Sequence, residues 1–123
     1  MFEAHGKTLE DVFRNAGEAL MSVVCEIKKV RPAGKVEIEA AATDPQGLLF
    51  EFLQQLIALV DIEVMFFSKF KVSIVDGVWL KAECWGEKAD PAKGNVVVKA
   101  VTKHRFSLKK GKQGWKATAV LDI

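Results

Sequence analysis

The sequence contains no tyrosine and little cysteine, histidine or proline. Its 123 residues include two cysteines, two histidines and three prolines. Cys25 and Cys84 lie far apart and match no metal-binding or redox spacing, so we predict two buried, reduced thiols in a cytoplasmic protein. Neither His5 nor His104 has a cysteine, histidine or carboxylate at ligand spacing. A glycine-rich phosphate loop and a nucleophile-elbow serine are also missing. These absences predict that the chain is not an enzyme with a conventional catalytic triad.

Long apolar runs are absent as well. No stretch reaches the roughly 18 consecutive apolar residues of a membrane-spanning helix, so we expect no membrane partner. Residues 1–5 contain no basic segment followed by an apolar run, and we therefore expect no signal peptide. Hydrophobic residues make up 50% of the chain, which is ample for a core at this length. We predict a single domain over residues 1–123.

Charge of one sign is missing from a long stretch of the chain. Residues 91–121 carry eight lysines and arginines and no acidic residue, whereas residues 1–90 carry ten basic and fifteen acidic residues. The net charge of +2 therefore conceals a strongly basic C-terminal quarter. Such segregation is typical of a protein that contacts an acidic partner, either nucleic acid or protein.

Two segments have the apolar spacing of helices. Thr8 and Asp11 form a start that resembles a capping box, and the spacing that follows predicts an amphipathic helix over residues 8–25. Asp44-Pro45 supplies an N-cap and a first-turn proline. The helix that begins there has a wide apolar arc and ends near Asp61. We expect it to lie beneath much of the core.

The other segments alternate between apolar and polar residues or are rich in apolar ones. Asp76-Gly77 between two such runs is a strong signal for a β-hairpin. Strands are predicted over residues 2–5, 35–40, 65–75, 78–82, 96–109 and 115–122. This order of elements predicts an α+β fold, with two helices packed on one face of a mainly antiparallel β-sheet.

The predicted strand over residues 96–109 carries a basic stripe. Alternation puts Lys99, Lys103 and Arg105 on one face, together with Val97, Val101, Ser107 and Lys109. His104 falls on the other face, with Val98, Ala100, Thr102, Phe106 and Leu108. A basic stripe on a rigid strand is typical of contact with phosphates or acidic side chains. The alternative is an ordinary solvated strand face.

Two further features allow a functional and a plain structural interpretation. Trp79, Trp85 and Trp115 are able to stack on nucleic-acid bases, or else they pack in the core and on sheet faces. Asp122 and the terminal carboxylate of Ile123 place two hard oxygen donors side by side, the donor type that Ca²⁺, Mg²⁺ and Mn²⁺ prefer. The alternative is a solvated chain end, because two donors are too few for a tight site.

Several segments together resemble the archease family. The first is Gly6-Lys7-Thr8-Leu9-Glu10-Asp11-Val12-Phe13, which looks like the start of that family's first helix. Residues 61–72, 82–87 and 114–115 are similar to later segments, and Leu121-Asp122-Ile123 matches the family's ending. Residues 98–104 resemble its K-A-x-T-Y-H signature, with Lys103 where the family usually has tyrosine.

The resemblance implies an accessory protein that activates an RtcB-type RNA ligase. Archeases promote guanylylation and multiple turnover of the ligase in tRNA splicing and RNA repair. Lys99, Lys103, His104 and Arg105 would then contact the ligase or tRNA. The alternative functions are a direct RNA-binding module and a chaperone-like protein that uses the basic strand face.

The resemblance also implies a divalent metal, typically Ca²⁺, at one tip of the protein. Its family ligands are an aspartate in an N-terminal H-T-A-D segment, the penultimate aspartate and the C-terminal carboxylate. Asp122 and Ile123 match the last two, whereas H-T-A-D would fall just before Met1 and has no counterpart here. Without that ligand we expect weakened Ca²⁺ binding. Without that strand we expect an uncovered sheet edge, which a second copy of the chain would pair with.

Overall fold

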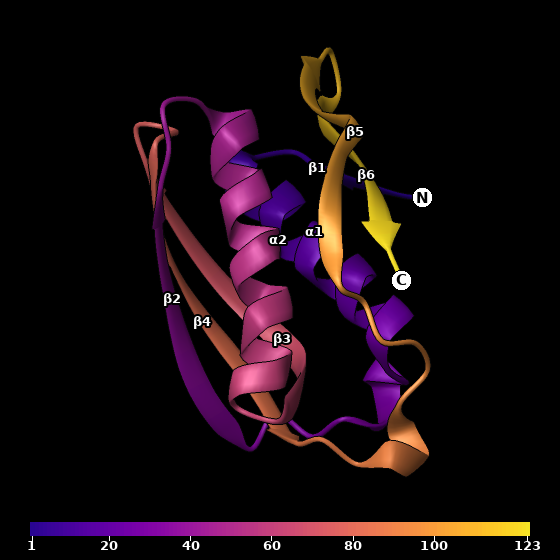
Figure 1. Ribbon diagram of the computed structural model, residues 1–123. Helices are drawn as coiled ribbons and strands as arrows, with labels where there is room; N and C mark the ends of the chain where they lie inside the picture. Colours follow the sequence, from indigo (N-terminus) through magenta and orange to yellow (C-terminus); the bar gives the residue numbers. More distant parts are fainter.

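Six strands and two α-helices make up the protein in a computed structural model that describes residues 1–123. The strands form two separate antiparallel sheets of three strands, ordered β1-β6-β5 and β2-β4-β3. Figure 1 shows both α-helices between the two sheets. The strands are β1 (Phe2–Gly6), β2 (Gly34–Ala41), β3 (Met65–Val75), β4 (Trp79–Lys88), β5 (Ala100–Gly111) and β6 (Gly114–Asp122). The predicted α+β class, with antiparallel strands, is confirmed.

The helices separate the two sheets, whereas the sequence had predicted one sheet with one covered face. Helix α1 (Leu9–Val24) contacts β1 on one side and β3 on the other, and α2 (Pro45–Ile62) contacts β5 and β2. The reason lies in the apolar surface of α2. Its buried side chains occupy too wide an arc for one sheet to cover: Leu48, Leu49, Phe52, Leu53, Leu56 and Ile57.

Both helices begin where the sequence predicts. The Thr8 hydroxyl accepts a hydrogen bond of 3.1 Å from the Asp11 backbone N–H. The Asp44 carboxylate accepts one of 2.7 Å from the Gly47 N–H, and Pro45 occupies the first turn. These caps satisfy backbone donors that the first turn of a helix otherwise leaves unpaired. No helix of the structure is sufficiently long and apolar to cross a membrane.

The predicted β3–β4 hairpin is also present. Asp76 and Gly77 have φ angles of 54° and 70°, the left-handed conformation that an Asp-Gly hairpin turn requires. Farther along β4, Gly86 lies so close to β3 that a Cβ atom there would overlap the Phe66 carbonyl oxygen. The two strands also change register between Phe67 and Lys69. This close approach at a β-bulge therefore requires glycine.

Strand β5 begins at Ala100, not at residue 96 as predicted. Residues 89–99 carry the chain from one sheet to the other past the ends of both helices (Figure 1). The partner strand β6 ends at Asp122, which lies opposite Ala100. Residues 96–98 therefore have no neighbouring strand to pair with, although their sequence favours one.

The two cysteines behave as the sequence predicts for buried apolar side chains. Both are free, and both are almost completely shielded from solvent. Burial raises the pKa of Cys25 to about 11 and that of Cys84 to about 12. Thiols with such raised pKa values are poor nucleophiles at neutral pH.

Glu87, near the end of β4, connects three segments of the chain. Its carboxylate accepts a hydrogen bond of 2.7 Å from the Arg31 backbone N–H and one of 3.0 Å from Lys93 Nζ. The Arg31 hydrogen bond and then the Lys93 hydrogen bond lower the pKa of Glu87 below its usual range. Because these bonds favour the ionised carboxylate, they stabilise the folded protein only while Glu87 is ionised.

This arrangement predicts a pH-dependent contribution to stability. Above the unfolded-state pKa of about 4.3, Glu87→Gln should lower the melting temperature by a constant amount. As the pH falls below that value and through the lowered pKa of the folded state, the difference should shrink to zero. Thermal unfolding of both proteins between pH 7 and pH 2.5 checks this. A difference that persists unchanged at pH 2.5 would contradict the role of the ionised carboxylate.

Candidate functional site

The most irregular part of the fold lies in β5, where the sequence predicted a regular basic stripe. Thr102 pairs with Val120 and Ser107 with Thr118, so the four residues 103–106 bulge out opposite the single residue Ala119. Lys103, His104 and Arg105 are all exposed, and Arg105 has a φ of 57°. The predicted basic residues are thus exposed together, but on a bulge and not on one face of a strand.

The bulge reverses the alternation of side chains along β5. Val101 and Leu108 are both buried, with 3% and 9% of their surface exposed. In a regular strand their side chains would point to opposite faces, because one residue number is odd and the other is even. The prediction that Val101 shares the basic face was therefore wrong, as was the separation of His104 from Lys103 and Arg105. Strict alternation fails here because a bulge adds residues to one strand only.

Helix α2 holds β5 on both sides of this bulge. Gln54 Oε1 accepts a hydrogen bond of 2.9 Å from the Val101 N–H, and Gln46 Oε1 accepts one of 3.2 Å from the Leu108 N–H. Between them, Phe50 packs edge-to-face against Phe106, with ring centroids 5.2 Å apart. These contacts also cover backbone donors on the outer edge of β5, which would otherwise be free to pair with another chain.

The three residues that position the bulge were not predicted from the sequence. Gln46, Phe50 and Gln54 are spaced four residues apart, so they form one stripe along α2. Two glutamines that flank an aromatic residue at four-residue spacing were the available signal. Lys103 extends back over this stripe, with its Nζ 5.7 Å from the Phe50 ring centroid.

A hollow of about 520 Å³ lies beside the bulge and the first turn of α2. Its lining combines aromatic, acidic and basic side chains, among them Asp44, Phe50, Glu51, Lys103 and Phe106. The hollow is open to solvent, and no histidine or cysteine lines it. Its mixed aromatic and charged lining provides a surface for contact with a partner.

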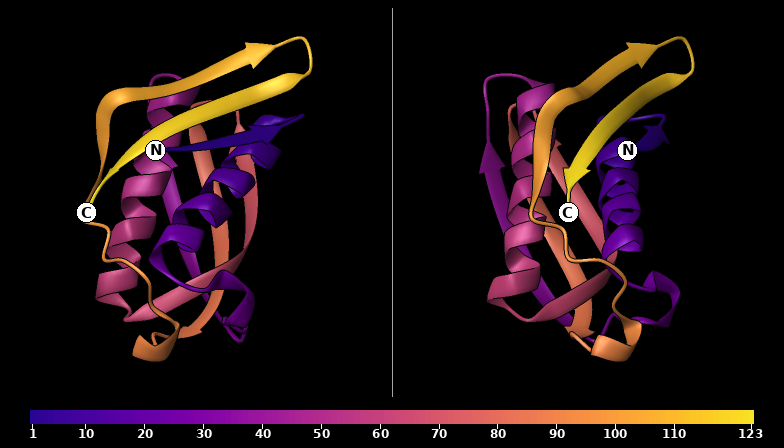
Figure 2. Two further views of the ribbon diagram at one scale, coloured as in Figure 1. Left: turned by 90° about the vertical axis from the view of Figure 1, so that its right-hand side faces the viewer. Right: turned by 45° about the vertical axis from the view of Figure 1, so that its right-hand side comes forward.

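The predicted C-terminal tip lies at the beginning of the same strand. Asp122 and Ile123 are exposed, and the Asp122 carbonyl accepts a hydrogen bond of 2.7 Å from the Lys99 N–H. Lys99 is itself exposed. The structure thus places the backbone of Lys99 beside that of Asp122, and the bulge follows a few residues farther along β5. Figure 2 shows the C-terminus next to the first residues of β5.

These carboxylates do not by themselves form a Ca²⁺ site. No group of three or more histidine, cysteine, aspartate and glutamate residues is placed to hold a metal ion. Ca²⁺ takes about six to eight oxygen ligands, many more than Asp122 and the chain terminus supply. The β1–β6 register is relevant here, because Phe2 pairs with Ala119. In that register, a residue two positions before Met1 would stand opposite Asp122.

The tryptophans do not form a common platform for stacking bases. Trp79 and Trp85 belong to β4 in one sheet, whereas Trp115 belongs to β6 in the other. Lys69 Nζ lies 5.2 Å from the Trp85 ring centroid, and Lys110 Nζ lies 5.8 Å from that of Trp115. Their contacts are those of aromatic side chains on separate sheet faces.

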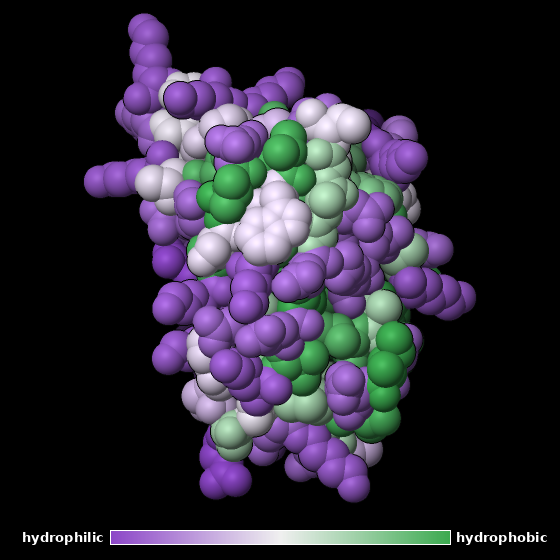
Figure 3. All heavy atoms as spheres, turned by 90° about the vertical axis from the view of Figure 1, so that its left-hand side faces the viewer, coloured by the Kyte–Doolittle hydropathy of each residue, from purple (hydrophilic) through white to green (hydrophobic).

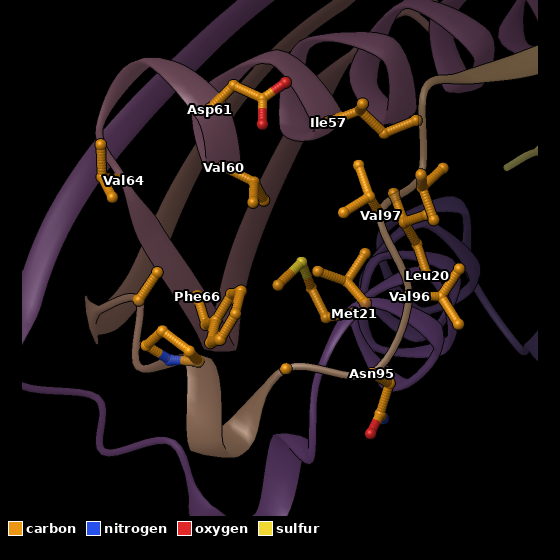
Figure 4. A pocket seen from close by; sticks show the side chains of 15 residues that line it. Leu20, Met21, Ile57, Val60, Asp61, Val64, Phe66, Asn95, Val96 and Val97 are labelled. Carbon is orange, nitrogen blue, oxygen red and sulfur yellow. The ribbon is translucent and has the colours of Figure 1, made fainter.

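An apolar pocket of about 440 Å³ opens at the end of the molecule where residues 89–99 cross over. Figure 4 shows Met21 from α1, Val60 from α2 and Phe66 from β3 pointing toward one another in this pocket. Val97, which is 76% exposed, forms part of the outer wall. The pocket lacks convergent polar groups, which are the usual basis of specificity for a small ligand.

The outer surface of the β2–β4–β3 sheet is mainly hydrophilic, with apolar side chains between the polar ones (Figure 3). Charges of both signs neutralise one another there: Lys35 lies 3.1 Å from Glu83, and both Lys35 and Lys81 lie 3.8 Å from Glu37. This is an ordinary solvated sheet face.

Comparison with known proteins gives a consistent result along the whole chain. Residues 1–123 match the family model of the archease protein family. A relative named protein archease from Sulfurisphaera tokodaii is 35% identical over 123 residues, which cover 98% of this chain and 88% of the relative. One of the same name from Pyrococcus furiosus is 37% identical over 125 residues, covering 97% and 88%.

Solved structures agree with this. The solution structure of Methanobacterium thermoautotrophicum protein 1598 superimposes with a TM-score of 0.81 at 30% identity, covering 98% of this chain and 88% of that one. A Thermotoga maritima crystal structure titled "archease, possible chaperone" shares the fold, with a TM-score of 0.72 at 14% identity over 99% and 88% of the chains. The chain therefore belongs to the archease family.

Proposed function

We propose that this archease is an accessory protein of an RtcB-type RNA ligase in the cytoplasm, and that it promotes ligase guanylylation and turnover during tRNA splicing or RNA repair. The observation that carries the proposal is the exposed bulge at Lys103, His104 and Arg105, held in place by α2. Exposed polar residues on a rigid scaffold are typical of a binding function. The relatives are named as proteins and not as enzymes, which agrees with an accessory role.

The chemistry of the tip supports contact with a nucleotide-handling site. Lys99 and the bulge supply cationic donors for phosphate or for acidic side chains. Asp122 and the Ile123 carboxylate supply anionic oxygens at the end of β6, where the Asp122 backbone contacts that of Lys99. We propose that these groups enter the ligase together. The bulge then makes the positively charged contacts and the terminal carboxylates make the negatively charged ones.

In this proposal, the chain supplies only part of the ligand set of Ca²⁺ or another divalent ion. Asp122 and Ile123 are two of the donors, and the rest must come from the ligase or from residues ahead of Met1, where the β1–β6 register points toward Asp122. The β1–β6 pairing ends at Phe2 and Ala119, so none of residues 1–123 pairs with Leu121 or Asp122 on the β1 side of β6. We propose that this edge is where the ligase, or a second copy of the chain, adds its own strand.

The test is ligase guanylylation measured with and without the chain. Asp122→Ala should reduce stimulation by about tenfold or more, because a charge-assisted contact contributes about 1.5–3 kcal/mol. Glu39→Ala is a matched control, since it removes one exposed carboxylate from the outer face of the other sheet. Full stimulation by Asp122→Ala would contradict the role of the tip. Failure of the unsubstituted chain to stimulate any RtcB-type ligase would contradict the proposal as a whole.

The apolar pocket favours a second candidate function, that of a chaperone-like protein. Val97 is 76% exposed and Val64 is 53% exposed at its rim, and exposed apolar surface of this kind binds apolar segments of other proteins. If this is the function, the chain should slow the aggregation of a heat-denatured test protein such as citrate synthase. Val97→Asp should abolish that effect without unfolding the chain. Equal protection by both proteins would exclude the pocket as the binding site.

A further inference from the structure

The far end of the β5–β6 hairpin extends past the body of the molecule (Figure 2). Lys112 and Gln113 form its turn between the paired residues Gly111 and Gly114. Two hollows of about 780 and 660 Å³ adjoin this turn. Among the residues that line them, Trp115 is the one hydrophobic side chain and none is acidic.

Five lysines gather around these hollows, and we call them the hairpin lysines. They are Lys7, Lys109, Lys110, Lys112 and Lys116. Lys116 has an acidic partner, since its Nζ lies 3.5 Å from Glu3. The other four have no carboxylate within 4.0 Å. On the β2–β4–β3 sheet, by comparison, Lys35 and Lys81 are paired with glutamates, whereas Lys69, Lys71 and Lys88 are not.

The lysines are brought together by a close backbone contact and not only by sequence. Gly114 has a φ of 120°, and a Cβ atom on it would overlap the Gly6 carbonyl oxygen and lie 3.0 Å from Lys7 Cα. The hairpin backbone therefore packs directly on the end of β1, which places Lys7 beside a turn more than 100 residues away in sequence. Lys110 is restrained in turn by the Trp115 ring, 5.8 Å away.

We propose that the hairpin lysines bind the phosphate backbone of nucleic acid. Ammonium groups on a preformed, solvent-open surface neutralise phosphates and release condensed counterions. A protein partner is less well matched, because the cores of protein–protein interfaces are depleted in lysine and enriched in aromatic and apolar residues. Clustered lysines on one part of a basic domain are the usual electrostatic footprint of nucleic-acid binding.

This site is separate from the proposed ligase-contacting tip. Asp122 and Gly114 are at opposite ends of β6, and eight strand residues span about 26 Å. A nucleic-acid strand bound at the hairpin lysines therefore leaves the terminal carboxylates free. The inference does not require that the chain acts on a ligase, since it concerns binding by the chain alone.

The test is fluorescence anisotropy of a labelled 20-nucleotide single-stranded RNA, with DNA of the same sequence in a parallel arm. Replacing Lys109, Lys110 and Lys112 with glutamine should weaken RNA binding at least tenfold at low salt. It should also reduce the slope of log K against log salt by about 2, because each lost phosphate contact on a single strand contributes about 0.7. DNA should show the same losses, since contacts to the backbone carry no sequence information.

A matched control removes three lysines elsewhere. Lys28, Lys71 and Lys88 are exposed, have no carboxylate within 4.0 Å and lie outside β5 and β6, and their replacement by glutamine leaves the same net charge as the test variant. The control should bind RNA as the unsubstituted chain does, and circular dichroism should confirm that both variants are folded. Equal losses in both variants would overturn the proposal. Displacement of the RNA by polyglutamate at equal charge concentration would also overturn it, in favour of an acidic protein surface.

Discussion

Helix α2 is apolar around most of its circumference, and this single constraint organises the fold. Phe52, Leu53 and Leu56 are completely buried, and each such side chain contributes about 1.5–3 kcal/mol by leaving water. One sheet covers only one side of a helix. The chain therefore supplies a second sheet on the opposite side, so that β2 and β5 cover α2 from two directions. Residues 89–99 are the crossover that this arrangement requires.

Helix α2 also shapes the candidate site on the β1–β6–β5 sheet. Gln46 and Gln54 pair with backbone donors of β5, and Phe50 packs on Phe106 between them. These contacts on both sides fix the ends of the bulge, so that Lys103, His104 and Arg105 project from a rigid base. A binding segment ordered in advance loses less conformational entropy when it meets its partner. The core and the candidate site are therefore coupled through a stripe of three side chains.

Much of this was predictable from residue pattern, and the failures have physical causes. Helix starts at Thr8 and Asp44 and the Asp76-Gly77 turn depend on local chemistry, which a sequence displays directly. The start of β5 and the phase of its side chains depend on where β6 ends and on how α2 holds the strand. Both depend on tertiary contacts, which a sequence does not display. Alternation over residues 96–109 therefore predicted a regular strand and assigned Val101 to the wrong face. The convergence of Lys7 on the hairpin turn likewise depends on two glycines that meet in space.

The two sheets differ in the features they carry. On the β2–β4–β3 sheet, Lys35 and Lys81 lie next to glutamates, whereas the β1–β6–β5 sheet carries the bulge, the terminal carboxylates and the hairpin lysines. The central claim is that the β1–β6–β5 sheet is the interacting layer of this archease. Amide hydrogen exchange in the presence of an RtcB-type ligase tests it most directly. The account predicts slower exchange at residues 99–106 and 120–123. Slower exchange confined to the β2–β4–β3 sheet would contradict it.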